Sequence, residues 1–170
     1  KTTDAGTTWI NLSSGTNSNI ENIFFLDNNT GYIAGGSCLG EPCSGIIMKT
    51  TNSGTTWTSL SVQTNYLYSI FFVDANIGYA TGSTGTALKT TDGGKSWISL
   101  TSGTSNSLES LFFLDEKTGF IIGTGGTLLR TIDGGITWTS LSSGTTQKLN
   151  GFSFLDANTG YIVGDGGTIL

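Results

Sequence analysis

The chain has 170 residues, a net charge of −5, 36% hydrophobic residues and only 11% charged residues. It is too apolar and too aromatic for a disordered chain. The absence of histidine excludes Ser-His-Asp triads, Cys-His pairs and histidine-bound metals. Seven basic residues against 12 acidic ones argue against nucleic acid as a partner, and no apolar run approaches the roughly 18 residues of a membrane-spanning helix.

An internal repeat begins at the N-terminus. An eight-residue box of the form S/T-x-D-x-G-x-T/S-W, with Asn at the acidic position of its second copy, occupies residues 2–9, 50–57, 90–97 and 131–138. Each tryptophan of the chain ends one box. Because Lys1 lies inside this repeat and no signal peptide precedes it, we expect the chain to be a piece of a longer protein.

Between the boxes, each repeat carries four short apolar or β-branched runs separated by Gly, Asn and Asp. In the last complete unit we predict strands over 108–114, 119–123, 127–132 and 138–142. Four antiparallel strands in a repeat of about 40 residues are typical of a β-propeller blade, whereas a β-sandwich gives no reason for the same Trp, Phe and Asp to recur. The sequence therefore predicts one all-β propeller segment over 1–170, with units at 1–19 (partial), 20–66, 67–107, 108–147 and 148–170 (partial).

The boxes resemble the Asp-box, or BNR repeat, of sialidases, sortilin-type receptors, xyloglucanases and photosystem II stability and assembly factors. The wider pattern, in which an FLD run, a GY pair and a glycine-rich turn precede each box, looks most like the last of these families and its secreted bacterial relatives. The resemblance covers the whole chain and implies a β-propeller fold, often with seven blades.

We expect the repeated box residues to be structural. The Asp side chain should accept hydrogen bonds from backbone N–H groups, the Gly should be left-handed, the Thr or Ser hydroxyl should close the loop, and the Trp should pack against the neighbouring sheet. Asn52 keeps an acceptor oxygen, so its turn should still form. These structural positions are Asp4, Gly6, Trp9, Asn52, Gly54, Trp57, Asp92, Gly94, Trp97, Asp133, Gly135 and Trp138.

A calcium site at the Asp-rich turns is an alternative that we do not favour. Calcium takes about six to eight oxygen ligands, whereas each box offers one carboxylate and the second box offers none. We therefore expect no metal and no cofactor.

A second set of charges recurs in every unit. An acid follows the first strand and a base ends the third; they are Asp27, Asp74, Asp115 and Asp156, and Lys1, Lys49, Lys89 and Arg130. The bases could form a ring for an acidic partner. We favour an Asp that caps its own turn and a base that is solvated or paired within its blade. The paired phenylalanines of the first strand should pack between blades rather than form a binding platform.

One unit contains an insertion near residues 37–45, which holds both cysteines and the only proline. We expect a Cys38–Cys43 disulfide that stiffens the loop, with free thiols as the alternative; two cysteines without histidine cannot complete a zinc site. A disulfide implies an oxidising compartment. Inserted loops often carry function, so Leu39, Gly40, Glu41 and Pro42 form a candidate partner loop.

The blade number has two interpretations, because the chain begins with a box and ends just before one. It is either an open arc of a larger ring or a closed four-bladed ring in which 8–12 pair with 167–170. We favour the arc, because the families that the chain resembles usually have more blades. Blades of the same polypeptide would then be partners.

Catalysis is not expected. The resemblance to sialidases would require three arginines and a Tyr/Glu pair, but Arg130 is the only arginine. A glycosidase needs two opposed carboxylates, and the unassigned acids Glu21, Glu41, Glu109, Glu116 and Asp165 fall in no motif. We expect a non-catalytic, secreted or cell-surface propeller that binds protein or glycan. The alternatives are a repeat segment of a larger adhesin or assembly, and an accessory module of a glycosidase with its catalytic residues elsewhere.

Overall fold

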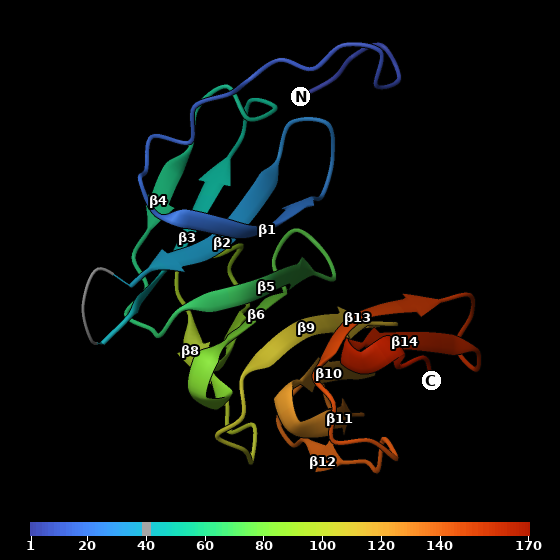
Figure 1. The fold of residues 1–170 in the computed structure, drawn as a ribbon. Coiled ribbons are helices and arrows are strands. Elements are labelled where there is room, and N and C mark those ends of the chain that lie inside the picture. Colours follow the sequence, from blue (N-terminus) through green and yellow to red (C-terminus); the bar gives the residue numbers. More distant parts are fainter. Residues whose placement is uncertain (39–41) are drawn as a thin grey trace.

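A computed structural model describes residues 1–38 and 42–170, and it is all-β. Three four-stranded antiparallel sheets and one two-stranded sheet follow one another along an arc (Figure 1). The strands are β1 (Asn19–Phe25), β2 (Gly31–Ser37), β3 (Ser44–Thr50), β4 (Thr58–Leu60), β5 (Leu67–Phe72), β6 (Gly78–Gly82), β7 (Ala87–Thr90), β8 (Ile98–Ser99), β9 (Leu108–Phe113), β10 (Gly119–Gly123), β11 (Leu128–Thr131), β12 (Thr139–Ser140), β13 (Leu149–Phe154) and β14 (Gly160–Gly164). Three short 3-10 turns complete the structure: η1 (Ser83–Gly85), η2 (Thr124–Gly126) and η3 (Asp165–Gly167).

Each sheet is a simple meander, because its strands pair in the order in which they occur in the chain. The first strands of successive sheets, β1, β5, β9 and β13, are neighbours and form the concave inner edge of the arc (Figure 1). The outermost strand is shorter than we predicted, since β12 pairs with β11 only through Leu129↔Ser140 and Arg130↔Thr139. The predicted propeller architecture is confirmed.

The arc is open, and the closed four-bladed interpretation is wrong for this structure. Leu170 exchanges backbone hydrogen bonds with Ile162 of its own sheet, whereas Ile10 donates to Lys1. The two termini lie at opposite ends of the arc (Figure 1). Residues 8–12 therefore cannot reach residues 167–170.

The core lies between blades, where the paired phenylalanines interlock as predicted. The second ring of each pair points back, so that Phe72 stacks on Tyr32 at 3.8 Å between centroids and Phe113 stacks on Tyr79 at 3.9 Å. The first ring points forward, and Phe71 meets Phe112 of the next blade at 5.5 Å. Burying each such ring contributes about 1.5–3 kcal/mol, so these stacks hold neighbouring blades together.

Candidate functional site

The four boxes form one repeated turn between the third and fourth strands. In the third copy, Asp92 Oδ1 accepts from the backbone N–H of Ser96 at 2.9 Å, and Oδ2 accepts from its hydroxyl at 2.6 Å. The Thr90 hydroxyl donates to Asp92 at 2.8 Å and accepts from the N–H of Gly94 at 2.9 Å. Gly94 has a φ of +85°, in the left-handed region. The boxes of Asp4 and Asp133 repeat these bonds.

Asn52 forms the same turn without a charge. Its Oδ1 accepts from the N–H of Thr56 at 2.9 Å, and its Nδ2 donates to the Thr56 hydroxyl at 2.9 Å. The direction of the hydroxyl bond is thus reversed. The geometry of the box needs an acceptor oxygen at this position and does not need a carboxylate.

The hydrogen bonds change the acidity of the box carboxylates. The Ser96 hydroxyl, followed by the Ser96 N–H, lowers the pKa of Asp92 from 3.8 to about 2. Thr137 acts in the same way on Asp133, and Thr8 on Asp4, and each pKa falls to about 2. The carboxylates of Asp4, Asp92 and Asp133 therefore all accept hydrogen bonds within their own turns.

Three of the four box tryptophans, Trp57, Trp97 and Trp138, meet a phenylalanine of their own sheet. Trp97 and Phe72 lie edge to face with centroids 6.1 Å apart, as do Trp138 and Phe113. Trp97 also joins the core cluster that contains Tyr32 of the preceding blade. Trp9 is 73% exposed at the N-terminal end of the arc.

The recurrent acid and base have different partners from one another. The acid caps its own hairpin as predicted: Asp74 Oδ1 accepts from the N–H groups of Asn76 and Ile77 at 2.6 and 2.7 Å. The bases Lys49 and Lys89, however, are not paired within their blades, and for them that prediction is wrong; Arg130 is exposed, as predicted. Lys89 Nζ donates to the carbonyl of Gly134, in the box of the next blade, at 2.7 Å.

This bond to the next box is part of a repeated tie between blades. Tyr79 donates from its hydroxyl to the same Gly134 carbonyl at 2.9 Å. Tyr32 and Lys49 converge in the same way on the carbonyl of Gly93, at 3.0 and 3.2 Å. The box carbonyl lies within reach because two successive left-handed residues turn it toward the preceding blade. Lys49 and Lys89 therefore stabilise the arc and are not free members of a cationic ring.

The insertion borders a surface groove. Cys38 and Cys43 form a disulfide, while Leu39, Gly40 and Glu41 of the candidate partner loop lie outside the described residues. Pro42 and Cys43 line a cavity of about 590 Å³ between the first two blades. Its other walls come from the β4–β5 connection and from β7 and β8, and include Val62, Gln63 and Leu88.

Two departures from the repeat meet at this groove. At the next two junctions, a serine of the interblade connection bonds to the 3-10 turn of the preceding sheet: Ser102 Oγ donates to Gly85 and Ser143 Oγ to Gly126, both at 2.7 Å. The β4–β5 connection has Val62 and Gln63 where the others have Ser-Gly. The groove where Pro42 and Cys43 meet the altered connection measures about 590 Å³, against about 300 Å³ at the following junction. A cavity of about 570 Å³ lies beside the unaltered β12–β13 connection.

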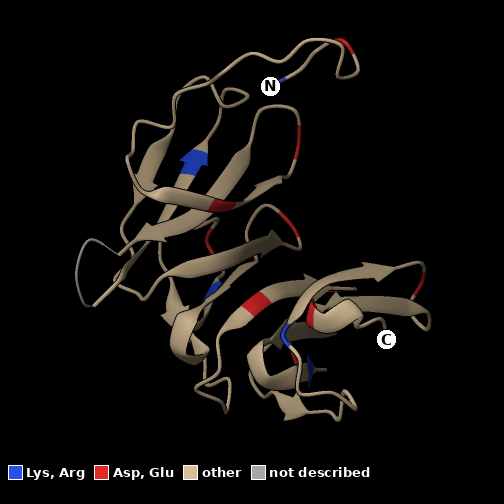
Figure 2. Ribbon diagram, viewed as in Figure 1, with Lys and Arg blue, Asp and Glu red and all other residues tan. Residues whose placement is uncertain are grey.

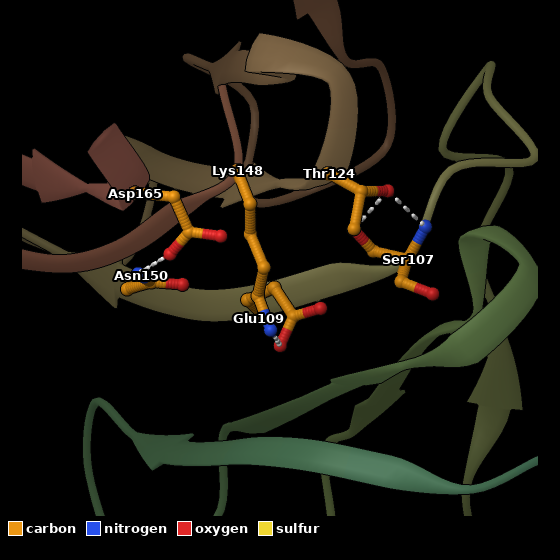
Figure 3. A network of polar contacts seen from close by, with 6 residues as sticks. All are labelled: Ser107, Glu109, Thr124, Lys148, Asn150 and Asp165. Carbon is orange, nitrogen blue, oxygen red and sulfur yellow. Dashed lines mark hydrogen bonds and ion pairs between the residues drawn. The ribbon is translucent and has the colours of Figure 1, made fainter. Parts of the chain in front are cut away.

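The acids left over by the turns have separate partners. Glu21 accepts a hydrogen bond from the Tyr66 hydroxyl. Glu109 pairs with Lys148 at 3.0 Å, and Asp165 accepts from Asn150 at 2.8 Å (Figure 3). Over residues 1–38 and 42–170, no three acidic or thiol side chains gather as a metal site would require. No helix in this part of the chain is long and apolar enough to cross a membrane.

Sequence reasoning missed a set of positions on the inner edge. Each first strand carries a β-bulge, and its extra residue is Glu21 in β1, Tyr68 in β5, Glu109 in β9 and Asn150 in β13. We call these four residues the bulge row. The available signal was their spacing, because each stands at the same distance before the Asp that follows its strand. Their different side chains concealed this register.

The repeated turn, the four-stranded blades and the interblade ties define an Asp-box β-propeller. The sequence model of the photosynthesis system II assembly factor YCF48 family matches residues 49–142 and 99–170. The chain belongs to this family. No curated protein sequence matches the chain.

Solved structures of two YCF48 proteins have the same fold. YCF48 bound to D1 peptide is 21% identical with a TM-score of 0.71, and the match covers 92% of this chain and 53% of that one. YCF48 from Cyanidioschyzon merolae is 18% identical, also with a TM-score of 0.71, over 88% of this chain and 49% of that one. The chain thus spans about half the length of these structures.

A glycoside hydrolase is also similar in fold. The GH74 xyloglucanase from Xanthomonas campestris is 13% identical with a TM-score of 0.71, over 88% of this chain and 28% of the enzyme. At these identities, the structural matches establish the fold and leave the function to the residues of this chain.

Proposed function

We propose that this chain is part of a non-catalytic propeller that binds a protein segment in the groove between its first two blades. The observation that carries the proposal is the meeting of the inserted loop and the altered β4–β5 connection around one cavity of about 590 Å³. At this junction the repeat departs from its usual sequence on both sides of the groove, in the insertion and in the β4–β5 connection. Recognition sites on repeat proteins are built by such local changes.

The chemistry of the groove favours a neutral, extended peptide. Val62, Leu88 and Leu100 supply an aliphatic surface, while Gln63 and Ser99 supply amide and hydroxyl groups, and no charged side chain of the described residues lines the cavity. This lining also has no aromatic ring on which a sugar could stack. A peptide with an aliphatic side chain and free backbone groups fits these walls better than a glycan does. In one of the similar structures, YCF48 is bound to a D1 peptide, which supports a peptide ligand.

A non-catalytic role is supported by the remaining acids. Glu21, Glu109 and Asp165 each bond to a different partner, so these described carboxylates form no opposed pair for glycoside hydrolysis. An accessory role beside a glycosidase is the second candidate, and the similarity to the GH74 fold favours it.

We also propose that the protein works in an oxidising compartment, secreted or at the cell surface. Disulfides persist under such conditions, and the Cys38–Cys43 disulfide borders the groove. Trapping with an alkylating reagent in intact cells should find these cysteines protected. Full alkylation would place the working protein in a reducing compartment.

The peptide proposal can be tested with a matched pair of groove variants. Peptides are selected from a random library on the protein and their affinities are measured with Ser99→Tyr and Ser140→Tyr. Both serines are exposed and occupy the same position of successive repeats. Ser99→Tyr fills the groove and should weaken binding about tenfold or more, while Ser140→Tyr should leave it unchanged. Equal binding by both variants would contradict the proposed site.

A further inference from the structure

The bulge row is fixed by the scaffold and yet differs in chemistry from blade to blade. A glycine stands opposite each bulge, at Gly35, Gly82, Gly123 and Gly164. A Cβ at Gly82 would lie 2.0 Å from the carbonyl oxygen of Tyr66, so the backbones approach too closely for any side chain. The backbone is thus the same in every blade, whereas the bulged residue is Glu, Tyr, Glu or Asn. Bulges re-aim side chains and are common beside functional sites.

Three acidic side chains that do not cap a box or a hairpin lie at this inner edge. The aspartates of the boxes and hairpins are occupied by backbone N–H groups, as at Asp74 and Asp92. Of the four other acids in the described chain, Glu21 and Glu109 belong to the row and Asp165 bonds to Asn150 within it, while Glu116 lies in the β9–β10 hairpin. Figure 2 shows the acidic positions on β1 and β9 among otherwise uncharged inner strands. Lys148, paired with Glu109, is the one base among these groups in the described residues.

Tyrosines add a second kind of group that attracts cations. Tyr66 is only 8% exposed and holds the Glu21 carboxylate through its hydroxyl. The ring of Tyr68 lies 5.3 Å from that of Tyr66, and its hydroxyl has no hydrogen-bond partner among the residues described. Carboxylates bind ammonium and guanidinium groups through charge-assisted hydrogen bonds, and tyrosine faces attract the same cations.

We propose that the bulge row is an interaction surface for a protein segment that carries lysine or arginine side chains. Glu21 and Glu109 take the cationic groups, and Tyr68 between them contributes its ring and its free hydroxyl. The excess of negative over positive charge at this edge selects for a basic partner. The ion pair in Figure 3 makes Lys148 a competitor for Glu109. No residue of the bulge row lines the groove, so the two proposals are tested by different variants.

The test uses a short fluorescein-labelled Gly/Ser peptide with spaced lysines, and a matched peptide with glutamines in their place. Fluorescence anisotropy is measured with the protein at low salt and at about 0.15 M salt. We expect the lysine peptide to bind and the glutamine peptide not to bind. Glu21→Gln and Glu109→Gln should each weaken binding about five- to tenfold, with the larger effect at Glu109, where the loss leaves Lys148 unpaired.

Two further variants separate recognition from general effects. Lys148→Met should strengthen binding about two- to fivefold, because it removes the competing cation; a purely structural role of the ion pair would not give this sign. Glu116→Gln removes the same charge from a hairpin at the other end of β9 and should leave binding unchanged. Equal binding of the two peptides, an equal loss with Glu116→Gln, or weaker binding with Lys148→Met would overturn the proposal. Spermidine that displaces the peptide at equal concentration would also overturn it, in favour of a free polyamine.

Discussion

At the scale of single residues, side chains at the surface do structural work in this protein. Three hydrogen bonds from Thr90 and Ser96 converge on the carboxylate of Asp92. The polar groups of the box form hydrogen bonds with one another. These bonds stabilise a turn that contains two successive left-handed residues. The sequence pattern predicted these bonds because short polar side chains close such turns wherever the spacing allows.

The depressed pKa values of the box aspartates predict a loss of stability in acid. The pKa of Asp92 is about 2 in the folded chain against 3.8 ordinarily, so its contribution is complete above about pH 4 and is lost as pH falls toward 2. Asp4 and Asp133 act in the same window. The melting temperature should therefore fall steeply between about pH 4 and about pH 2.

The variant Asp92→Asn, combined with Asp133→Asn, should make this acid-induced fall shallower, because Asn52 shows that an amide supports the same turn. Glu116→Gln removes one exposed carboxylate outside the boxes; it serves as the control and should leave the slope as it is. An unchanged slope in the double variant would show that other groups carry the acid sensitivity.

Two buried threonines predict opposite effects of the same substitution. Thr81 and Thr90 are each 1% exposed, but the Thr81 hydroxyl has no hydrogen-bond partner in the described structure, whereas the Thr90 hydroxyl bonds to Asp92 and Gly94. Thr81→Val should raise the free energy of unfolding by about 1 kcal/mol, and Thr90→Val should lower it by about 1–3 kcal/mol. Urea denaturation measures both, and a loss of stability in Thr81→Val would reveal a partner for that hydroxyl.

At the scale of the element, the first strand of each blade combines packing and recognition. Its two phenylalanines point to opposite neighbours, since successive side chains of a strand alternate. The bulge interrupts that alternation near the start of the strand and places an extra residue at the inner edge. From this geometry we expect that replacing the glycine opposite the bulge destabilises the fold.

The substitution Gly123→Ala should destabilise the protein by about 1–3 kcal/mol, as overpacking does. Its Cβ would lie 2.0 Å from the carbonyl oxygen of Ser107. Gly151→Ala is the control, since its Cβ would meet only Val163 at 3.7 Å, and it should change stability by less than about 0.5 kcal/mol. Thermal unfolding monitored by circular dichroism compares the two. Equal effects would mean that strand propensity, and not the close approach, sets the cost.

At the scale of the whole molecule, the arc holds together by apolar stacks and by polar ties at one face. Burial, followed by the charge of Asp133, raises the pKa of Tyr79 to about 12, so its hydroxyl remains a donor to Gly134. Lys89 donates to the same carbonyl and lies 5.3 Å from the centre of the Tyr79 ring. Tyr79 and Lys89 therefore both bind the Gly134 carbonyl, and the losses of stability on removing each donor should not add.

The variant Tyr79→Phe should lower the free energy of unfolding by about 0.5–1.5 kcal/mol. Lys89→Met should lower the free energy of unfolding more in the Tyr79→Phe background than in the original chain, because the Gly134 carbonyl then loses its last hydrogen bond to the preceding blade. Tyr161→Phe, at a tyrosine that is 49% exposed, is the control and should be neutral. A double-mutant cycle by chemical denaturation checks the coupling, and strict additivity would contradict the shared tie.

Particular residues show where prediction from the sequence reached its limit. The box Asp92 and the hairpin Asp74 were assigned to their turns because each contacts groups within four residues of itself. Lys89 was misplaced because its partner lies 45 residues away, in another blade. Glu21 and Glu109 looked unrelated until the register of the bulges brought them to the same position of the repeat.

The sequence by itself determined the blade, since local hydrogen bonds and the alternation of apolar residues act over a few positions and are repeated in each unit. Tertiary structure decided which blades touch, that the ends of the arc stay apart, and where the inserted loop meets the altered β4–β5 connection. It also decided that Lys49 and Lys89 bond across blades and that the bulge row forms one edge. These outcomes depend on contacts between distant residues, which are set by how the sheets fan around the arc and not by any single repeat.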